Sequence, residues 1–201
     1  MSSLSPAPTT PRSEHCPTGM YGPRGWTVKS GVWHELADCR DELRSTIIPG
    51  QFGFAPAGLI TDDGRPVDDY TPFHDLGPGT ARRLLEILPE SQLADRQNLA
   101  PTLGALLRAC VRARGRIRLS GYGIGPQRHD ERVTVEGLWI EDPDLIDYLV
   151  DCEIADPDEE ERFWEEVAER YCLDAEASPD EIKLLRRHWT HGPLGTWLWW
   201  D

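Results

Sequence analysis

The chain has 201 residues, a mass of 22.7 kDa and a formal net charge of −14 at pH 7. This length suits one well-filled hydrophobic core. No stretch approaches the ~18 uncharged apolar residues of a membrane helix, and the acidic balance opposes binding to nucleic acid.

The cysteines indicate a reducing compartment. They are odd in number, lie far apart and form no CxxC pair, which is unlike a disulfide framework or a zinc site. The N-terminus also lacks the apolar segment of a secretory signal, so we expect a cytoplasmic protein. The five cysteines are Cys16, Cys39, Cys110, Cys152 and Cys172.

The first part of the chain divides into a tail and the start of a domain. Residues 1–25 are rich in turn formers, which predicts a disordered N-terminal tail, and Trp26 is the first expected anchor of a single α+β domain over residues 26–201. From Ser30, apolar residues recur every three or four positions and predict a helix that ends before Pro49. Its apolar face comprises Val32, Leu36, Cys39, Leu43 and Ile47.

The next elements follow from capping and turn signals. Residues 51–60 suggest a short strand, followed by a turn at residues 62–64. Thr80 is the expected cap of a helix over residues 81–88, and Asn98 of a helix over residues 99–114. Gly115 is expected to end the second helix.

The apolar period then changes from helical to two. Residues 116–124 and 132–140 both alternate, which predicts an antiparallel pair at the centre of the sheet. The pattern places Ile117 and Leu119 opposite Arg116, Arg118 and Tyr122. In the second strand it places Val133, Val135 and Trp139 on one face.

Two capping boxes predict helices near the end of the chain, over residues 160–171 and 182–189. The aromatic run at residues 195–201 has strand character. Together these elements predict an α+β fold, with several helices packed on a small antiparallel sheet in a single main domain. The expected core includes Leu103, Leu106, Trp139, Trp164, Val167 and Leu185.

Charge is strongly polarised along the chain. Residues 141–181, an acidic helical subregion, hold 18 acids against Arg162 and Arg170. Within it, glutamates four residues apart repel each other at a cost of a few tenths of a kcal/mol per pair. One interpretation is a surface that docks on a basic protein, as an inhibitor or immunity-type protein would; the other is a solvated face. The candidate partner-binding residues are Asp158, Glu161, Glu165, Glu166 and Glu169.

A basic stretch complements this subregion. Seven arginines and no acid lie between Arg96 and His129. They suggest a weak anion or nucleic-acid site, with Tyr122 available to stack on a base, or a patch that neutralises the protein's own acids. The candidate anion-binding residues are Arg112, Arg114, Arg116 and Arg118.

Residues 62–75 contain oxygen and imidazole groups suited to a divalent metal that could activate water. Their spacing matches no calcium-loop pattern, so an ordinary polar loop is the alternative. The candidate ligands are Asp62, Asp63, Asp68, Asp69, His74 and Asp75.

No catalytic constellation or cofactor motif appears elsewhere, since the pair His188 and His191 lacks further zinc ligands and the glycines of residues 121–125 do not precede a helix. The sequence therefore favours a non-enzymatic interaction or regulatory protein with a basic protein partner. A metal-assisted hydrolase that uses residues 62–75 and a weak arginine-patch nucleic-acid binder are the alternatives.

Overall fold

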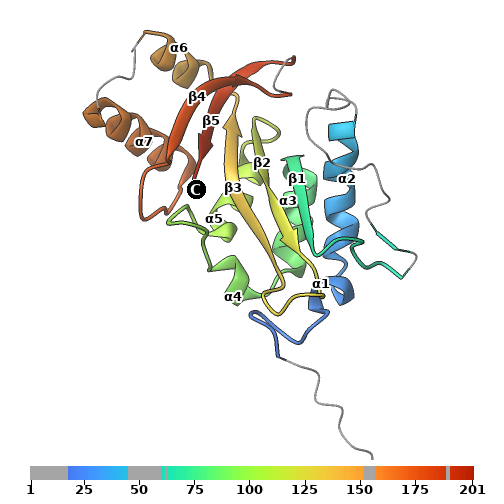
Figure 1. The fold of residues 1–201 in the computed structure, drawn as a ribbon. Coiled ribbons are helices and arrows are strands. Elements are labelled where there is room, and N and C mark those ends of the chain that lie inside the picture. Colours follow the sequence, from blue (N-terminus) through green and yellow to red (C-terminus); the bar gives the residue numbers. More distant parts are fainter. Residues whose placement is uncertain (1–17, 45–59, 62, 152–156, 189–190) are drawn as a thin grey trace, which may run out of the picture.

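The computed structural model describes residues 18–44, 60–61, 63–151, 157–188 and 191–201. These residues form seven helices and a five-stranded antiparallel sheet, which confirms the predicted α+β class (Figure 1). The helices are α1 (Trp26–Lys29), α2 (Val32–Arg44), α3 (Pro78–Ile87), α4 (Glu90–Leu93), α5 (Leu103–Arg112), α6 (Pro143–Asp151) and α7 (Pro157–Tyr171). The strands are β1 (Tyr70–Leu76), β2 (Ile117–Ile124), β3 (Arg132–Ile140), β4 (Glu181–Arg186) and β5 (Leu194–Trp199).

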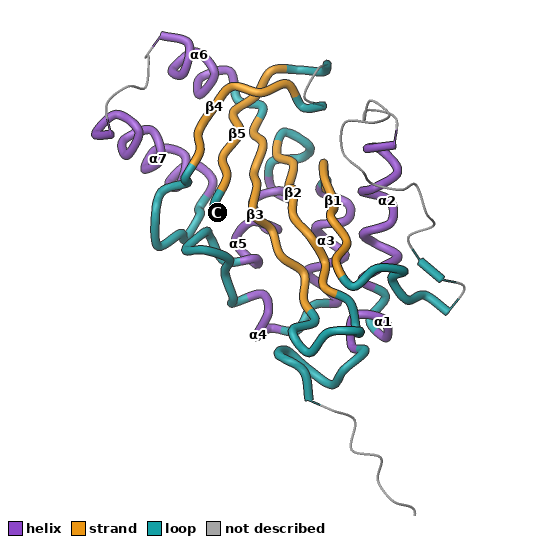
Figure 2. Tube along the Cα trace, viewed as in Figure 1, coloured by secondary structure: helices purple, strands orange, loops and turns teal. Residues whose placement is uncertain are grey.

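The sheet has the strand order β1-β2-β3-β5-β4. In the view of Figure 2, α3 and α5 lie behind the strands, α2 lies alongside β1, and α6 and α7 lie at the end of the sheet formed by β4 and β5. The core lies between the helices and the covered face of the sheet, with Phe73, Leu106, Leu119 and Leu198 all buried. Within the part of the chain that the structure describes, no helix is long and apolar enough to cross a membrane.

The predicted antiparallel pair of β2 and β3 is confirmed, but one face assignment in it is wrong. Gly121 pairs with Val135 and Ser120 pairs with Gly137, so Glu136 is an extra residue in β3. Such a bulge reverses the alternation of side chains beyond it. Leu138 and Ile140 therefore continue the core face of Val133 and Val135. Trp139, predicted on that face, lies on the other side.

Trp139 is nevertheless buried, with 3% of its surface exposed. Its indole Nε1 donates a hydrogen bond of 2.9 Å to the carbonyl oxygen of Leu185 on β4. Its ring lies against Gly195, where any side chain would collide with it. Trp139 is thus buried against β4 and β5 and lies outside the main hydrophobic core.

Both predicted caps in the middle of the chain are wrong. Helix α3 begins at Pro78 after Gly77, so Thr80 lies inside it. Helix α5 is capped by Thr102, whose hydroxyl accepts a hydrogen bond of 3.2 Å from the amide of Ala105. Asn98 has a positive φ of 46° and belongs to the turn before α5. The proline at position 101 favours an extended backbone before it, which delays the start of the helix.

The predicted helix over residues 182–189 is also wrong, because this segment forms strand β4. Ile182 pairs with Leu198 of β5, and the amide of Asp180 donates to the carbonyl oxygen of Trp199 at 2.8 Å. The Asp180 carboxylate accepts from the amide of Asp201 at 2.8 Å. Pairing with the aromatic strand β5 therefore uses groups that the sequence pattern assigned to a helix cap.

Leu185 is half-buried because β4 is an edge strand, so its predicted burial is wrong. The other predicted core residues, Leu103, Leu106, Trp139, Trp164 and Val167, are buried. The helix predicted from Ser30 corresponds to α2, with residues 45–48 outside the described residues, and the C-terminal aromatic run forms β5 as predicted.

Two predicted segments fall mostly outside the described residues. Residues 1–17 of the predicted tail are among them, whereas Tyr21 packs against the core. Of the strand predicted over residues 51–60, only Ile60 is described, and it forms an isolated bridge with Pro66. Trp26, the predicted anchor, is buried.

Candidate functional site

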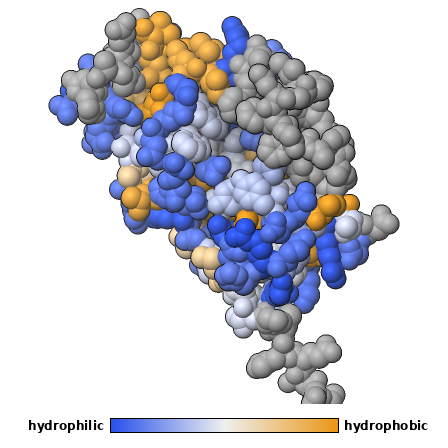
Figure 3. Space-filling model, in the orientation of Figure 1, coloured by the Kyte–Doolittle hydropathy of each residue, from blue (hydrophilic) through white to orange (hydrophobic). Residues whose placement is uncertain are grey.

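Helix α7 carries four exposed glutamates, Glu161, Glu165, Glu166 and Glu169, which we call the acidic face. Its other side buries Phe163, Trp164 and Val167, and these apolar contacts orient the helix. Asp158 is exposed in the first turn. Figure 3 shows hydrophilic surface where α7 lies in Figure 1.

Most of the acidic face lacks a cation from the protein itself. Glu166 pairs with Arg170 at 2.5 Å, but within the described ranges Glu161, Glu165 and Glu169 form no ion pair. Glu165 lies four residues from both Glu161 and Glu169, a spacing at which like charges repel on a helix. The negative potential of this face is therefore left largely uncompensated.

Arg170 instead serves a buried acid next to the helix. Its guanidinium donates to the Asp142 carboxylate at 2.8 Å, and the Tyr171 hydroxyl donates to the same oxygen at 2.6 Å. Burial raises the pKa of Asp142, but the hydrogen bonds from Tyr171 and Arg170 outweigh it and hold the pKa below its usual value. Burial and the bond to Asp142 raise the pKa of Tyr171, which keeps the phenol a donor.

The arginines of the basic stretch do not form one cluster with the acidic face. Arg112 donates to the carbonyl oxygen of Tyr171 at 2.7 Å, and Arg118 lies 3.8 Å from the Asp75 carboxylate. Arg114 and Arg116 are exposed near the turn that follows α5. The anion-binding role of these four residues stays a prediction.

The candidate metal ligands lie along an irregular segment and strand β1. Asp63 pairs with Arg65 at 2.9 Å, and Asp75 accepts two hydrogen bonds from Arg187. Asp68 and Asp69 are exposed before β1, His74 lies in β1, and Asp62 lies outside the described residues. Among the described residues, no group of three or more His, Cys, Asp or Glu side chains could hold a metal ion.

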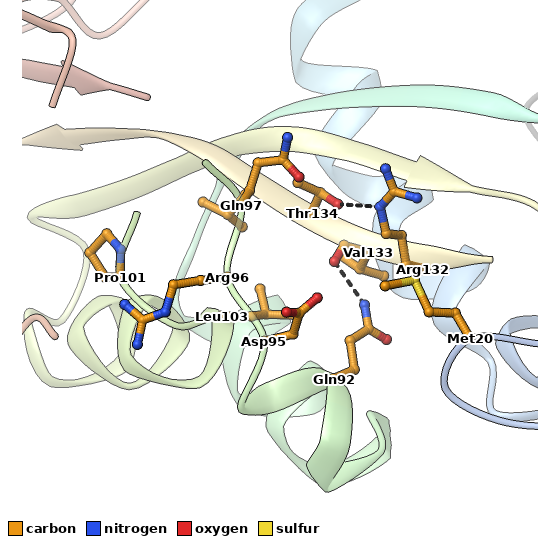
Figure 4. Close-up of a pocket in the computed structure, with 11 residues that line it drawn as sticks. Met20, Gln92, Asp95, Arg96, Gln97, Pro101, Leu103, Arg132, Val133 and Thr134 are labelled. Carbon is orange, nitrogen blue, oxygen red and sulfur yellow. Dashed lines mark hydrogen bonds between the residues drawn. The ribbon is translucent and has the colours of Figure 1, made fainter. Parts of the chain in front are cut away.

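A pocket of about 290 Å³ lies beside the first half of β3 (Figure 4). Strand β5 pairs with β3 only from Gly137 to Ile140, so residues 132–135 have no strand on that side among the described residues. Helix α4, the start of α5 and the segment between them cover this edge instead. We call this cavity the β3 pocket; it is lined by Met20, Gln92, Asp95, Arg96, Gln97, Pro101, Leu103, Arg132, Val133, Thr134 and Val135.

Two acceptors in the β3 pocket lack a full set of partners. Gln92 is only 1% exposed; its Nε2 donates to the carbonyl oxygen of Val133 at 2.7 Å, whereas its Oε1 has no hydrogen-bond partner within the described ranges. Asp95 accepts a hydrogen bond from the Tyr21 hydroxyl and forms no ion pair in the described part of the chain. Burial and this bond raise the pKa of Tyr21, so the phenol remains a neutral donor.

The two arginines of the β3 pocket are already engaged. Arg132 donates to the Asp130 carboxylate at 2.7 Å, and the hydrogen bonds from Arg128 and Arg132 lower the pKa of Asp130 to about 2. Arg96 donates to the carbonyl oxygen of Asp174 at 2.7 Å and pairs with Glu176 at 3.3 Å. Figure 4 shows these two guanidinium groups at opposite ends of the pocket, with Gln92 and Asp95 between them.

The β3 pocket was missed in the sequence. Gln92 and Asp95 lie in a short polar segment that resembles an ordinary connection, and only tertiary packing buries Gln92. Gln92 is a single polar residue between Pro89, which follows the end of α3, and the half-buried Leu93, and one such residue is too weak a signal to predict a pocket. Comparisons with protein-family models, curated proteins and solved structures give no match for this chain.

Proposed function

We propose that the protein is a non-enzymatic binding protein that docks on a basic protein partner through the acidic face of α7. The observation that supports this role most directly is the absence of ion pairs at Glu161, Glu165 and Glu169 among the described residues, although all three side chains are exposed. An inhibitor or immunity-type protein, which blocks a basic protein by covering it, would use such a surface.

Helix stability alone does not account for this arrangement. The negative residues of the first turn favour the positive end of the helix dipole. Glu165 and Glu169 lie beyond that turn and repel each other at four-residue spacing, and Arg162, three residues before Glu165, forms no ion pair with either among the described residues. A basic partner would remove this repulsion and would be attracted over a distance of about 10 Å at 0.1 M ionic strength.

The buried side of α7 gives the acidic face a fixed orientation. Phe163 and Val167 are fully buried, and the Trp164 ring meets the Trp200 ring edge-on, with 5.4 Å between centroids. A helix held in this way presents its glutamates as a preorganised row, which reduces the entropy lost when a partner binds. The charges can then speed encounter and select for a basic surface.

The test begins with affinity capture from a native lysate at low and high salt, followed by binding kinetics with the purified partner. The decisive variant replaces Glu161, Glu165, Glu166 and Glu169 with lysine. We expect its affinity to fall by tens-fold or more, chiefly through a lower association rate, and we expect added salt to slow association of the natural protein.

A matched control changes the net charge equally but elsewhere. It replaces the exposed Asp68, Asp69, Glu86 and Glu90 with lysine. If the acidic face is the interface, this control should lose far less affinity than the α7 variant. Equal losses in the two variants, or an affinity that depends on neither salt nor the α7 charges, would show that the acidic face is only a solvated surface.

A further inference from the structure

In the part of the chain that the structure describes, the β3 pocket holds one buried acceptor without a donor, Gln92 Oε1, and one carboxylate without a cation, Asp95. We propose that it binds the guanidinium group of an arginine side chain from the basic partner. This inference deepens the proposed function and rests on it for the identity of the partner, but the pocket chemistry is tested separately below.

The acceptors define the chemistry of the occupant. Among the described residues, the Oε1 atom of Gln92 is buried and has no donor, and the bond of Nε2 to Val133 fixes the orientation of the amide. A buried acceptor without a donor costs free energy. A ligand that donates a hydrogen bond to this acceptor removes that cost when it binds. The nearby Asp95 carboxylate has only the neutral hydroxyl of Tyr21 as a side-chain partner in the described residues. An occupant with several donors and a positive charge complements both groups.

A guanidinium fits these requirements better than an anion does. Although Arg96 and Arg132 line the β3 pocket, Glu176 and Asp130 pair with them, which leaves Asp95 as the lining charge without an ion pair among the described residues. A guanidinium carries five N–H donors in one plane and can bond a carboxylate and an amide oxygen together. Pro101 and Leu103 offer apolar surface for the methylene groups of the same side chain.

The β3 pocket is connected to the end of the acidic helix. The loop that follows α7 contacts the pocket wall, since Arg96 bonds to Asp174 and Glu176. In addition, the amide of Glu176 donates to the carbonyl oxygen of Leu99 at 2.9 Å. Figure 1 shows this loop beside the segment between α4 and α5. A basic surface that covers the C-terminal end of α7 and the loop after it would therefore lie next to the pocket wall.

The test uses a small probe with the full chain. Nα-acetyl-arginine methylamide is titrated into ¹⁵N-labelled protein, with the neutral citrulline analogue as the comparison. We expect the arginine probe to shift the amide signals of residues 92–97 and 132–135 in the millimolar range, and the citrulline analogue to have little effect. Absence of shifts with the arginine probe, or equal shifts with both, would overturn the proposal.

Variants locate the site. Asp95→Asn retains an acceptor for Tyr21 but removes the charge, and we expect about tenfold weaker binding of the arginine probe. Glu90→Gln removes an exposed charge on α4 outside the pocket and should leave binding unchanged. Unaltered probe binding by a folded Asp95→Asn variant contradicts the assignment.

Two further measurements separate this proposal from the proposed function. The four-site lysine variant of α7 should bind the arginine probe within about twofold of the natural protein, because none of its four residues lines the β3 pocket. The Asp95→Asn variant should also lose affinity for the captured partner. If it loses the probe but binds the partner normally, the partner does not place an arginine in the β3 pocket.

Discussion

The two faces of helix α7 differ in their contacts with the rest of the protein. On one face, Phe163, Trp164 and Val167 are buried against the core. On the other, Glu161 and Glu165 are exposed and form no ion pair in the part of the chain that is described. The fold therefore needs the apolar face to hold the helix, whereas of the acidic face only Glu166 has an ion-pair partner in the described structure.

An acid beside the same helix sharpens this contrast. The side chain of Asp142 is only 7% exposed, and Arg170 and Tyr171 both bond to it. A buried carboxylate requires such partners, because removal of its hydration is costly. The protein thus supplies donors where an acid is buried, whereas the exposed Glu161, Glu165 and Glu169 have no ion-pair partner among the described residues. Their charge remains available for an external partner.

The largest expected effect comes from the buried face of α7. Trp164→Ala removes a ring that packs edge-on against Trp200, and we expect a loss of ~3–5 kcal/mol in the free energy of unfolding. Urea denaturation monitored by circular dichroism measures it. Glu165→Ala, one residue away on the exposed face, is the matched control and should change stability by about 0.5 kcal/mol or less. Similar effects of the two changes would contradict the division into two faces.

The parts of the fold that could be predicted are those where local pattern and tertiary packing agree. The alternation in residues 116–124 and 132–140 predicted β2 and β3, and a capping box predicted the helix that became α7, in which Trp164 and Val167 are buried as expected. Prediction failed where packing overrides the local signal. Residues 181–186 follow a capping box, yet they pair with β5 because that pairing satisfies a whole row of backbone groups.

The bulge at Glu136 and the β3 pocket illustrate a second limit. A single extra residue reverses which side chains face the core, and the sequence around it has no signal that distinguishes it from a regular strand. The pocket depends on where β5 stops pairing with β3, which is a property of two distant segments. The acidic face could be read from the sequence, because charge and helical spacing are local properties.

A smaller effect is expected at Asp142. Its pKa is lowered because the bonds from Tyr171 and Arg170 outweigh burial, so the ionised form contributes stability above the unfolded pKa of about 3.9. Asp142→Asn should therefore cost about 1.5–3 kcal/mol at pH 7. The difference from the natural protein should shrink as the pH falls below about 4, through the folded pKa.

Urea titrations at several pH values measure this dependence. Asp144→Asn is the control, because Asp144 bonds to the same Arg170 at 3.4 Å but its side chain is 80% exposed. A cost for Asp142→Asn that does not change between pH 7 and acid would show that its contribution does not depend on its charge.

The smallest expected effect on stability falls on the acidic face, and its sign is informative. Glu165→Lys turns two repulsive contacts at four-residue spacing, with Glu161 and Glu169, into attractive ones, and turns one attractive contact, with Arg162 three residues away, into a repulsive one. We expect the free energy of unfolding to rise by about 0.5–1 kcal/mol, with the Glu161 contact contributing more because the acid precedes the base.

The same substitution places a positive charge at the centre of the proposed interface, so association with a basic partner should slow. Thermal denaturation and binding kinetics on one variant measure both quantities. A gain in stability with slower association would mean that the protein keeps a locally unfavourable glutamate because binding requires it. A gain in stability with unchanged association would show that Glu165 is only a solvated surface residue. This outcome would contradict the proposed binding role of this part of α7.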